Sequence, residues 1–288
     1  LKKPKHYEAT FSEGRAEFRR CDNDFDTYTE IVVSPEDDIE LRRVRLTNRT
    51  RTKRIIDITS YAEVVLASNG SDLAHPAFSN LFVRTEIINQ RQAILCTRRP
   101  RSEEENPPWM FHLMAVHGAE ISSISFETDR MKFIGRGNNL ESPHVMTDLS
   151  PLSGSQGSVL DPVVAIQFQI ILLPEGSVTI DMVTGISESR GEALTLVEKY
   201  QDKQIADRVF ELAWTHSQVV LRQINANESD AQLYGRLASS IIYANSLLRA
   251  DPAILIKNRR GQSGLWGYSI SGDLPIVLLQ IEDPANIN

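Results

Sequence analysis

Two aromatic residues and one carboxylate, Trp266, Tyr268 and Asp273, lie close together in the last part of the 288-residue chain. A flat aromatic ring can bury the apolar C–H face of a pyranose, and a carboxylate can accept two hydroxyl hydrogen bonds. These three residues are therefore candidate substrate-binding residues of a sugar site. In the alternative, structural interpretation, Asp273 is the N-cap, or next to it, of a helix starting near Pro275, and the aromatic rings pack in the core. The residues alone leave both interpretations open.

Other local patterns do not support a metal or a nucleotide site. Residues 22–26 imitate the start of a calcium loop, but Thr27 stands where that loop needs glycine and Val33 where it needs glutamate. The sequence Gly135-Arg136-Gly137 lacks the third glycine of a dinucleotide fingerprint. The six histidines are scattered and show no metal-ligand spacing. We therefore expect neither a metal nor a bound cofactor in this chain.

The composition is ordinary for a soluble globular protein, with 41% hydrophobic and 24% charged residues. A net charge of −7 and a pI of about 5.5 argue against a general nucleic-acid binder. Cys21 and Cys96 are expected to be free, buried thiols. Neither a run of about 18 apolar residues nor a signal peptide is visible. The chain lacks an initiator methionine and stops just after an apolar run, so we expect an excised fragment.

The secondary structure expected from the sequence changes along the chain, from strands in the first part to helices in the last. From Tyr7 to about Thr184 the pattern is mostly β, with short polar turns between the strands. Two packed antiparallel sheets are the favoured architecture at this size. In the strand expected over residues 39–46, the alternation of apolar and charged residues is interrupted at Arg42-Arg43, which suggests a bulge. The expected strands cover residues 30–33, 39–46, 54–66, 81–88, 93–97, 110–116, 121–127, 163–173 and 178–183.

After Gly185 the apolar spacing changes from two to between three and four residues, which indicates helices. We expect the first helix over residues 190–202, with Ser187 or Ser189 as a cap. The second should end near Ile224. The third should start at Ser229 or Asp230 and end before the Asp-Pro pair at 251–252.

The ordered set of local motifs resembles one known family over nearly the whole chain. The set comprises Tyr7-Glu8 with Phe11 and residues 15–20, 35–38, 59–66, 75–79, 97–101, 160–162, 237–239 and 261–278. It resembles the C-terminal, phosphorylase-like region of cyclic β-1,2-glucan synthases. More broadly, it is similar to glycoside hydrolase family 94, which includes cellobiose, chitobiose and β-1,2-oligoglucan phosphorylases. The resembled motif has glycine before Ile-Ser-Gly-Asp, where this chain has Ser269, a departure that could change the local turn.

The resemblance implies a mainly β chain with C-terminal helices. The large antiparallel β-sandwich (a supersandwich, carbohydrate-binding-like) would cover residues 1–186. A helical linker would cover residues 187–250, and residues 251–288 would open a truncated (α/α)6 barrel. Family 94 enzymes cleave a β-glucosidic bond with inorganic phosphate as co-substrate, in one inverting displacement that needs a general acid. In the family that acid lies deep in the barrel, beyond Asn288, so no catalytic residue is assigned and the fragment alone is expected to be inactive.

The resemblance therefore predicts the carbohydrate-binding sandwich and linker of a hexosyltransferase-type enzyme acting on β-1,2-glucan. Its partner would be the glucan, with no nucleic acid and no membrane span in this piece. The parent would be a bacterial inner-membrane protein with this region cytoplasmic. Two alternatives stay open. One is a structural module that mediates homodimerisation without touching glycan, and the other is a truncated stand-alone β-1,2-oligoglucan phosphorylase.

Overall fold

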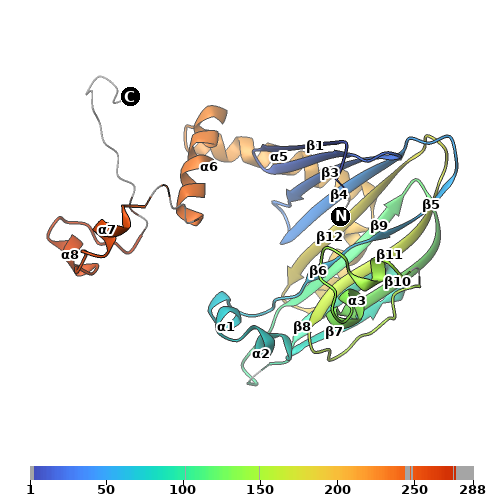
Figure 1. Cartoon of the computed structure of the whole chain (residues 1–288), viewed down its shortest axis with the longest axis horizontal. Coiled ribbons are helices and arrows are strands. Elements are labelled where there is room, and N and C mark those ends of the chain that lie inside the picture. The colour runs from blue at the N-terminus through green and yellow to red at the C-terminus, as the bar shows by residue number, and fades with distance from the viewer. Residues whose placement is uncertain are drawn as a thin grey trace. The chain divides into compact units, whose positions relative to one another are not determined.

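The structure is a computed structural model that describes residues 3–100, 102–148, 150–243, 247, 249–274 and 276 (Figure 1). The chain divides into two compact units, Leu1–Val220 and Leu221–Asn288, which are described separately below.

The described part of the first unit contains an eight-stranded antiparallel sheet. Its strand order is β1-β2-β3-β4-β12-β9-β8-β7, so β12, the last of the described strands along the chain, lies between β4 and β9 (Figure 1). Strand β12 pairs with β4 over Ser177–Gly185 and with β9 over Thr179–Ser187, which makes it the central link of the sheet. The strands are β1 (His6–Ser12), β2 (Arg15–Cys21), β3 (Phe25–Val33), β4 (Ile39–Asn48), β7 (Val83–Ile88), β8 (Ala93–Arg98), β9 (Trp109–His117) and β12 (Ser177–Ser187).

A smaller, four-stranded antiparallel sheet packs on one face of the large sheet. Its strand order is β10-β11-β5, and β6 pairs with the N-terminal end of β11. Its strands are β5 (Arg54–Thr59), β6 (Ala62–Glu63), β10 (Glu120–Asp129) and β11 (Pro162–Leu172). Strand β11 is buried on both sides over its first five residues, where Ile166 faces the large sheet while Ala165 packs against Phe133 of helix α3 (Arg130–Ile134). The prediction of two packed antiparallel sheets is confirmed.

The other face of the large sheet is covered by helices α4 (Arg190–Tyr200) and α5 (Lys203–Gln223). Helix α4 begins at the N-cap Ser189, whose side chain accepts a hydrogen bond from the Glu192 backbone N–H at 3.2 Å. Its buried residues, with those of α5, share one apolar core with the inward residues of β3, β4, β8, β9 and β12. These two helices confirm the helical spacing seen in the sequence, and α5 ends one residue before the predicted Ile224.

The predicted bulge at Arg42-Arg43 is wrong, because β4 keeps continuous register with both β3 and β12. The apparent slip has another cause. Ile39 and Leu41 pack in the core shared with α4 and α5, whereas Val44 and Leu46 pack against the smaller sheet. Because both faces of the large sheet are covered, the apolar side of the strand changes along its length without an extra residue.

Two other expectations differ in detail. The single strand expected over residues 54–66 is divided into β5 and β6 at Ser60 and Tyr61, although the Ser60 N–H still donates to the Ile166 carbonyl of β11 at 2.9 Å. Helices α1 (Asn69–Ala74), α2 (Pro76–Asn80) and α3 were not expected within the β region. The short 3-10 turns are η1 (Asn89–Arg91) and η2 (His144–Met146).

The regular secondary structure described in the second unit is helical. Helix α6 (Glu228–Ile242) starts one or two residues before the predicted position, with Asn227 as N-cap and Asp230 completing a capping box. Two single-turn helices follow, α7 (Pro252–Leu255) and α8 (Ser263–Trp266). The helix expected near Pro275 lies outside the described residues. The start of an (α/α)6 barrel therefore stays a prediction.

Candidate functional site

The predicted site residues Trp266, Tyr268 and Asp273 lie in one short loop at the end of α8. Gln262 donates from Nε2 to Asp273 Oδ1 at 2.7 Å and to the Ser271 carbonyl at 3.0 Å. The Trp266 indole N–H donates to the same carbonyl at 3.3 Å. The structure thus links Trp266 and Asp273 through Ser271 and Gln262, and this orients the carboxylate. Trp266 and Tyr268 are 64% and 70% exposed, so their rings are free for contact in this chain.

Ser269 stands where the resembled motif has glycine, and its backbone conformation shows what that position requires. Its φ is +59°, in the left-handed region that glycine adopts without cost and other residues rarely adopt. The glycine expected at this place therefore matches the backbone found here. The turn keeps the conformation that suits glycine, and Ser269 adopts it under strain.

A second candidate site is a cleft of about 600 Å³ at the opening between the two sheets. We call it the inter-sheet cleft. Sequence reasoning missed it, because its lining comes from β3, β4, β9 and β12 on one side and from the segment joining β5 to β6 on the other. The lining residues are Thr29, Glu40, Arg42, Val44, Thr59, Ser60, Tyr61, Ala62, His112, Met182 and Thr184. Its volume lies in the range of small-molecule sites in proteins.

His112 forms the floor of the inter-sheet cleft and is only 4% exposed. Its Nδ1 lies 2.8 Å from Thr184 Oγ1 and its Nε2 lies 2.9 Å from Ser60 Oγ, so both ring nitrogens have hydroxyl partners. Burial, with a smaller contribution from the charge of Arg42, lowers the pKa of His112 to about 4. The imidazole is therefore neutral near pH 7 and holds the two hydroxyls in place.

The rim of the inter-sheet cleft carries charged and hydroxyl groups that can meet a polyhydroxylated ligand. Arg42 donates to Glu40 at 3.1 Å, and both side chains remain nearly half exposed. The Tyr61 hydroxyl donates to Glu63 at 3.0 Å, and burial together with that carboxylate raises the pKa of Tyr61 to about 12. Hydrogen bonds to such charged groups are stronger than neutral ones. The cleft thus brings charged and hydroxyl-bearing side chains from separate segments to one space of small-molecule size.

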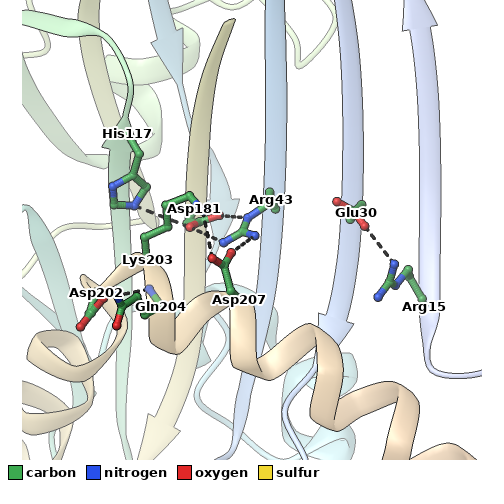
Figure 2. A network of polar contacts seen from close by, with 9 residues as sticks. All are labelled: Arg15, Glu30, Arg43, His117, Asp181, Asp202, Lys203, Gln204 and Asp207. Atoms are coloured by element: carbon green, nitrogen blue, oxygen red, sulfur yellow. Dashed lines mark hydrogen bonds and ion pairs between the residues drawn. The ribbon is translucent and has the colours of Figure 1, made fainter.

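A buried ion cluster lies on the opposite face of the large sheet, under α5 (Figure 2). Arg43 and Asp181 face each other across β4 and β12, and the guanidinium donates from Nε and Nη2 to the two carboxylate oxygens at 2.6 and 2.9 Å. Arg43 also donates from Nη1 to Asp207, which Lys203 contacts at 2.9 Å. Burial would lower the pKa of Arg43, but the two carboxylates hold it above its usual value. This cluster links α5 to the sheet, with Arg43 and Asp181 buried and Asp207 and Lys203 partly exposed.

The cysteines and the potential metal ligands form no further site among the described residues. Among the described residues, no group of three or more His, Cys, Asp or Glu side chains could hold a metal ion. Cys96 is free and buried, and burial raises the pKa of its thiol to about 12. Cys21 is free but only half-buried, so the predicted burial holds for Cys96 alone. The described part of the chain contains no helix that combines the length and the apolar character needed to cross a membrane.

Two antiparallel sheets of unequal size, with helices following the last strand, define a β-sandwich domain joined to a helical segment. The family described as glycosyl hydrolase 94, supersandwich domain, matches residues 1–203 of this chain. The chain therefore belongs to the glycosyl hydrolase 94 supersandwich family.

One curated relative extends the match over almost the whole chain. It is the cyclic beta-(1,2)-glucan synthase NdvB of Rhizobium meliloti (strain 1021), 32% identical over 278 residues that cover 96% of this chain. The chain spans only 10% of the length of that relative.

Two solved structures show a more distant likeness. A candidate kojibiose phosphorylase from the human microbiome is 12% identical, with a TM-score of 0.38 over 70% of this chain and 22% of that chain. The heparan sulfate lyase HepC of Pedobacter heparinus is 7% identical, with a TM-score of 0.35 over 65% of this chain and 22% of that chain.

Proposed function

We propose that this chain is the glycan-binding sandwich and helical linker of a family 94-type phosphorylase region in a cyclic β-1,2-glucan synthase. The similarity of 278 residues to one curated synthase supports the parentage. In this proposal residues 1–186 form the sandwich, 187–250 the linker and 251–288 the first part of the barrel. Inorganic phosphate is the co-substrate of the parent, and the general acid lies outside this chain. The parent is a bacterial inner-membrane protein, with this region on the cytoplasmic side.

The observation that carries glycan contact is the inter-sheet cleft. Its hydroxyl, guanidinium and carboxylate groups converge from separate strands onto one space of ligand size. Sugars present hydroxyls that both donate and accept, so a rim with Arg42 and Glu40 side by side offers both kinds of partner. A purely structural sandwich would have no need for such a rim beside a fully hydrogen-bonded histidine.

The chain itself should bind short β-1,2-glucans through this cleft. We expect titration calorimetry to detect binding, and Arg42→Ala to weaken the affinity about tenfold, because hydrogen bonds to a charged group are lost. The matched control is Arg45→Ala, which removes the same side chain from the same strand but from a residue that does not line the cleft.

Equal losses in the two variants would point to a general effect of surface charge. Failure of the unaltered chain to bind any β-1,2-glucan would favour the alternative of a structural or homodimerising module. A full-length gene product without the remaining length of a synthase would favour a truncated stand-alone phosphorylase.

In the intact parent, Asp273 contributes to recognition of the glucosyl unit, with Trp266 and Tyr268 beside it. Asp273→Asn keeps the size of the side chain and removes its charge. We expect kcat/KM to fall about tenfold, which corresponds to about 1.4 kcal/mol of transition-state binding. Steady-state phosphorolysis of β-1,2-glucan by the full-length enzyme measures this effect.

Asp251→Asn is the matched control, because Asp251 is another exposed aspartate of the second unit and accepts a hydrogen bond from Ala253 N at 2.7 Å as the N-cap of α7. It should leave kcat/KM unchanged. Unchanged kinetics in Asp273→Asn, with a small loss of thermal stability, would instead make Asp273 a structural residue.

A further inference from the structure

The hydrogen bonds that pass through His112 have a direction, and Ser60 sets it. The Ser60 hydroxyl accepts a hydrogen bond from the Ile166 backbone N–H at 3.1 Å, and its single hydrogen can go to one of two acceptors. His112 Nε2 lies 2.9 Å away, whereas the Ile166 carbonyl oxygen lies 3.4 Å away and already accepts from the Ser60 N–H at 2.9 Å. Because an O–H···O bond is normally no longer than about 3.0 Å, the hydroxyl hydrogen goes to Nε2.

This direction determines which nitrogen of His112 carries the proton. The imidazole is buried, and its pKa of about 4 leaves it neutral near pH 7, so it has one N–H and one bare nitrogen. Since Nε2 accepts from Ser60, the proton is on Nδ1. The Nδ1–H therefore donates to Thr184 Oγ1, which lies 2.8 Å away.

Thr184 thus accepts a hydrogen bond and keeps its own hydroxyl hydrogen. The side chain is half-buried and lines the inter-sheet cleft, and among the described residues only His112 bonds to its hydroxyl. A hydroxyl that already accepts one hydrogen bond is a better donor, because successive hydrogen bonds polarise one another. The series of bonds that begins at the Ile166 N–H therefore ends in an unused donor at the cleft.

Glu40 indicates the kind of group that this donor would meet. It lies directly opposite Thr184 in the pairing of β4 with β12, so the two side chains project from the same face of the large sheet, and both line the cleft. A carboxylate beside the donor repels an anionic ligand, but it accepts a hydrogen bond from a hydroxyl. A sugar hydroxyl fits this pair, since its oxygen can accept from Thr184 and its hydrogen can go to Glu40.

We propose that Thr184 binds glucan by donating a hydrogen bond to a sugar hydroxyl, and that His112 is the positioning residue that orients the Thr184 hydroxyl. The inference rests on the proposed glucan contact at the inter-sheet cleft and adds the direction of the hydrogen bonds there. Together with Glu40, the donor favours a free sugar hydroxyl over an ether oxygen, because an ether oxygen accepts from Thr184 but has no hydrogen for the carboxylate.

The position of the proton on His112 can be measured without any ligand. Long-range proton–nitrogen NMR spectra of the 288-residue chain near neutral pH distinguish the protonated nitrogen of an imidazole from the bare one. The signals of His112 are those missing from the spectrum of His112→Gln. We expect the proton on Nδ1. A proton on Nε2 would overturn the proposal, because Thr184 would then donate to His112 and would have no hydrogen left for a sugar.

Titration calorimetry with short β-1,2-glucans tests the donor itself. Thr184→Val keeps the shape of the side chain and loses the hydroxyl, and we expect the affinity to fall about fivefold through the loss of one hydrogen bond. Thr184→Ser restores the hydroxyl and should recover most of the affinity. Thr179→Val is the matched control, because Thr179 is another half-buried threonine of β12 but does not line the cleft. It should bind like the unaltered chain.

The outcomes separate this inference from the proposed function. If the unaltered chain binds glucan and Thr184→Val binds it equally well, the inference is wrong and the proposed glucan contact stands. If the unaltered chain binds no β-1,2-glucan, both are wrong, whichever nitrogen of His112 carries the proton. An equal loss in Thr179→Val, or no recovery in Thr184→Ser, would mean that Thr184 acts through the packing of β12 and not as a donor, which also overturns the inference.

Discussion

Asp181→Asn is expected to lower the free energy of unfolding of the sandwich unit by about 3 to 5 kcal/mol, the cost of breaking a buried ion pair from one side. Asp181 is fully buried, and the Arg43 side chain is only 8% exposed. Without the carboxylate, the guanidinium keeps Asp207, which is 43% exposed, as its charged partner. The buried charge is then poorly compensated. Urea denaturation of the chain measures the change.

Two further variants separate this effect from a general loss of charge. Asp24→Asn breaks the Arg54–Asp24 pair, whose side chains are 41% and 45% exposed, and should cost less than about 1 kcal/mol. The double change Arg43→Met with Asp181→Leu removes both charges and should regain most of the loss. A cost for Asp181→Asn no greater than that for Asp24→Asn would contradict the importance of the buried pair.

The second large effect concerns pH. We expect the chain to lose about 3 kcal/mol of folding free energy through His112 as the pH falls from 6.5 to 4. In the unfolded chain the imidazole takes up a proton near pH 6.5, whereas in the folded chain its pKa is about 4. The unfolded state therefore binds more protons in this window, and stability rises with pH. The contribution is complete above the unfolded pKa and is lost as acid is added.

Urea midpoints measured at several pH values, for the unaltered chain and for His112→Gln, isolate this contribution. A glutamine side chain is uncharged at every pH, so the variant should show a shallower pH dependence between 6.5 and 5, whatever its absolute stability. The carboxylates common to both proteins cancel in the difference. Parallel curves over that window would mean that His112 takes up its proton equally easily in both states.

Strands β8, β9 and β11 were predictable as short apolar segments between polar turns. Strand β12 was foreseen over most of its length. Strand β4 was misinterpreted, because its two ends pack against different layers and the sequence does not say where a second layer begins. Strand β1 is exposed along its whole length, although Tyr7, Ala9 and Phe11 alternate on one side of it and the two aromatic rings contact Phe18 of β2.

The candidate sites also differ in how far they could be predicted from the sequence. Trp266, Tyr268 and Asp273 are neighbours in sequence, so their proximity needed no knowledge of the fold. His112 and its partners Ser60 and Thr184 come from distant segments and meet only through strand register. Arg43 likewise lies 138 residues from Asp181, the aspartate that is buried with it. Such pairs depend on which strands become neighbours, and local sequence does not carry that information.

The central position of β12 has a consequence for how the chain is made. Strands β1 to β4 and strands β7 to β9 are joined within the large sheet only by β12, which is the last of the described strands to be synthesised. Domains generally fold from the N-terminus as the ribosome proceeds, but here the two halves cannot pair until residue 187 has emerged. Until then the edges of β4 and β9 carry unpaired backbone groups that could pair with another nascent chain. Close spacing of ribosomes on one messenger RNA would therefore favour misassembly. A pause in translation after β12 would allow this strand to pair with β4 and β9 of its own chain.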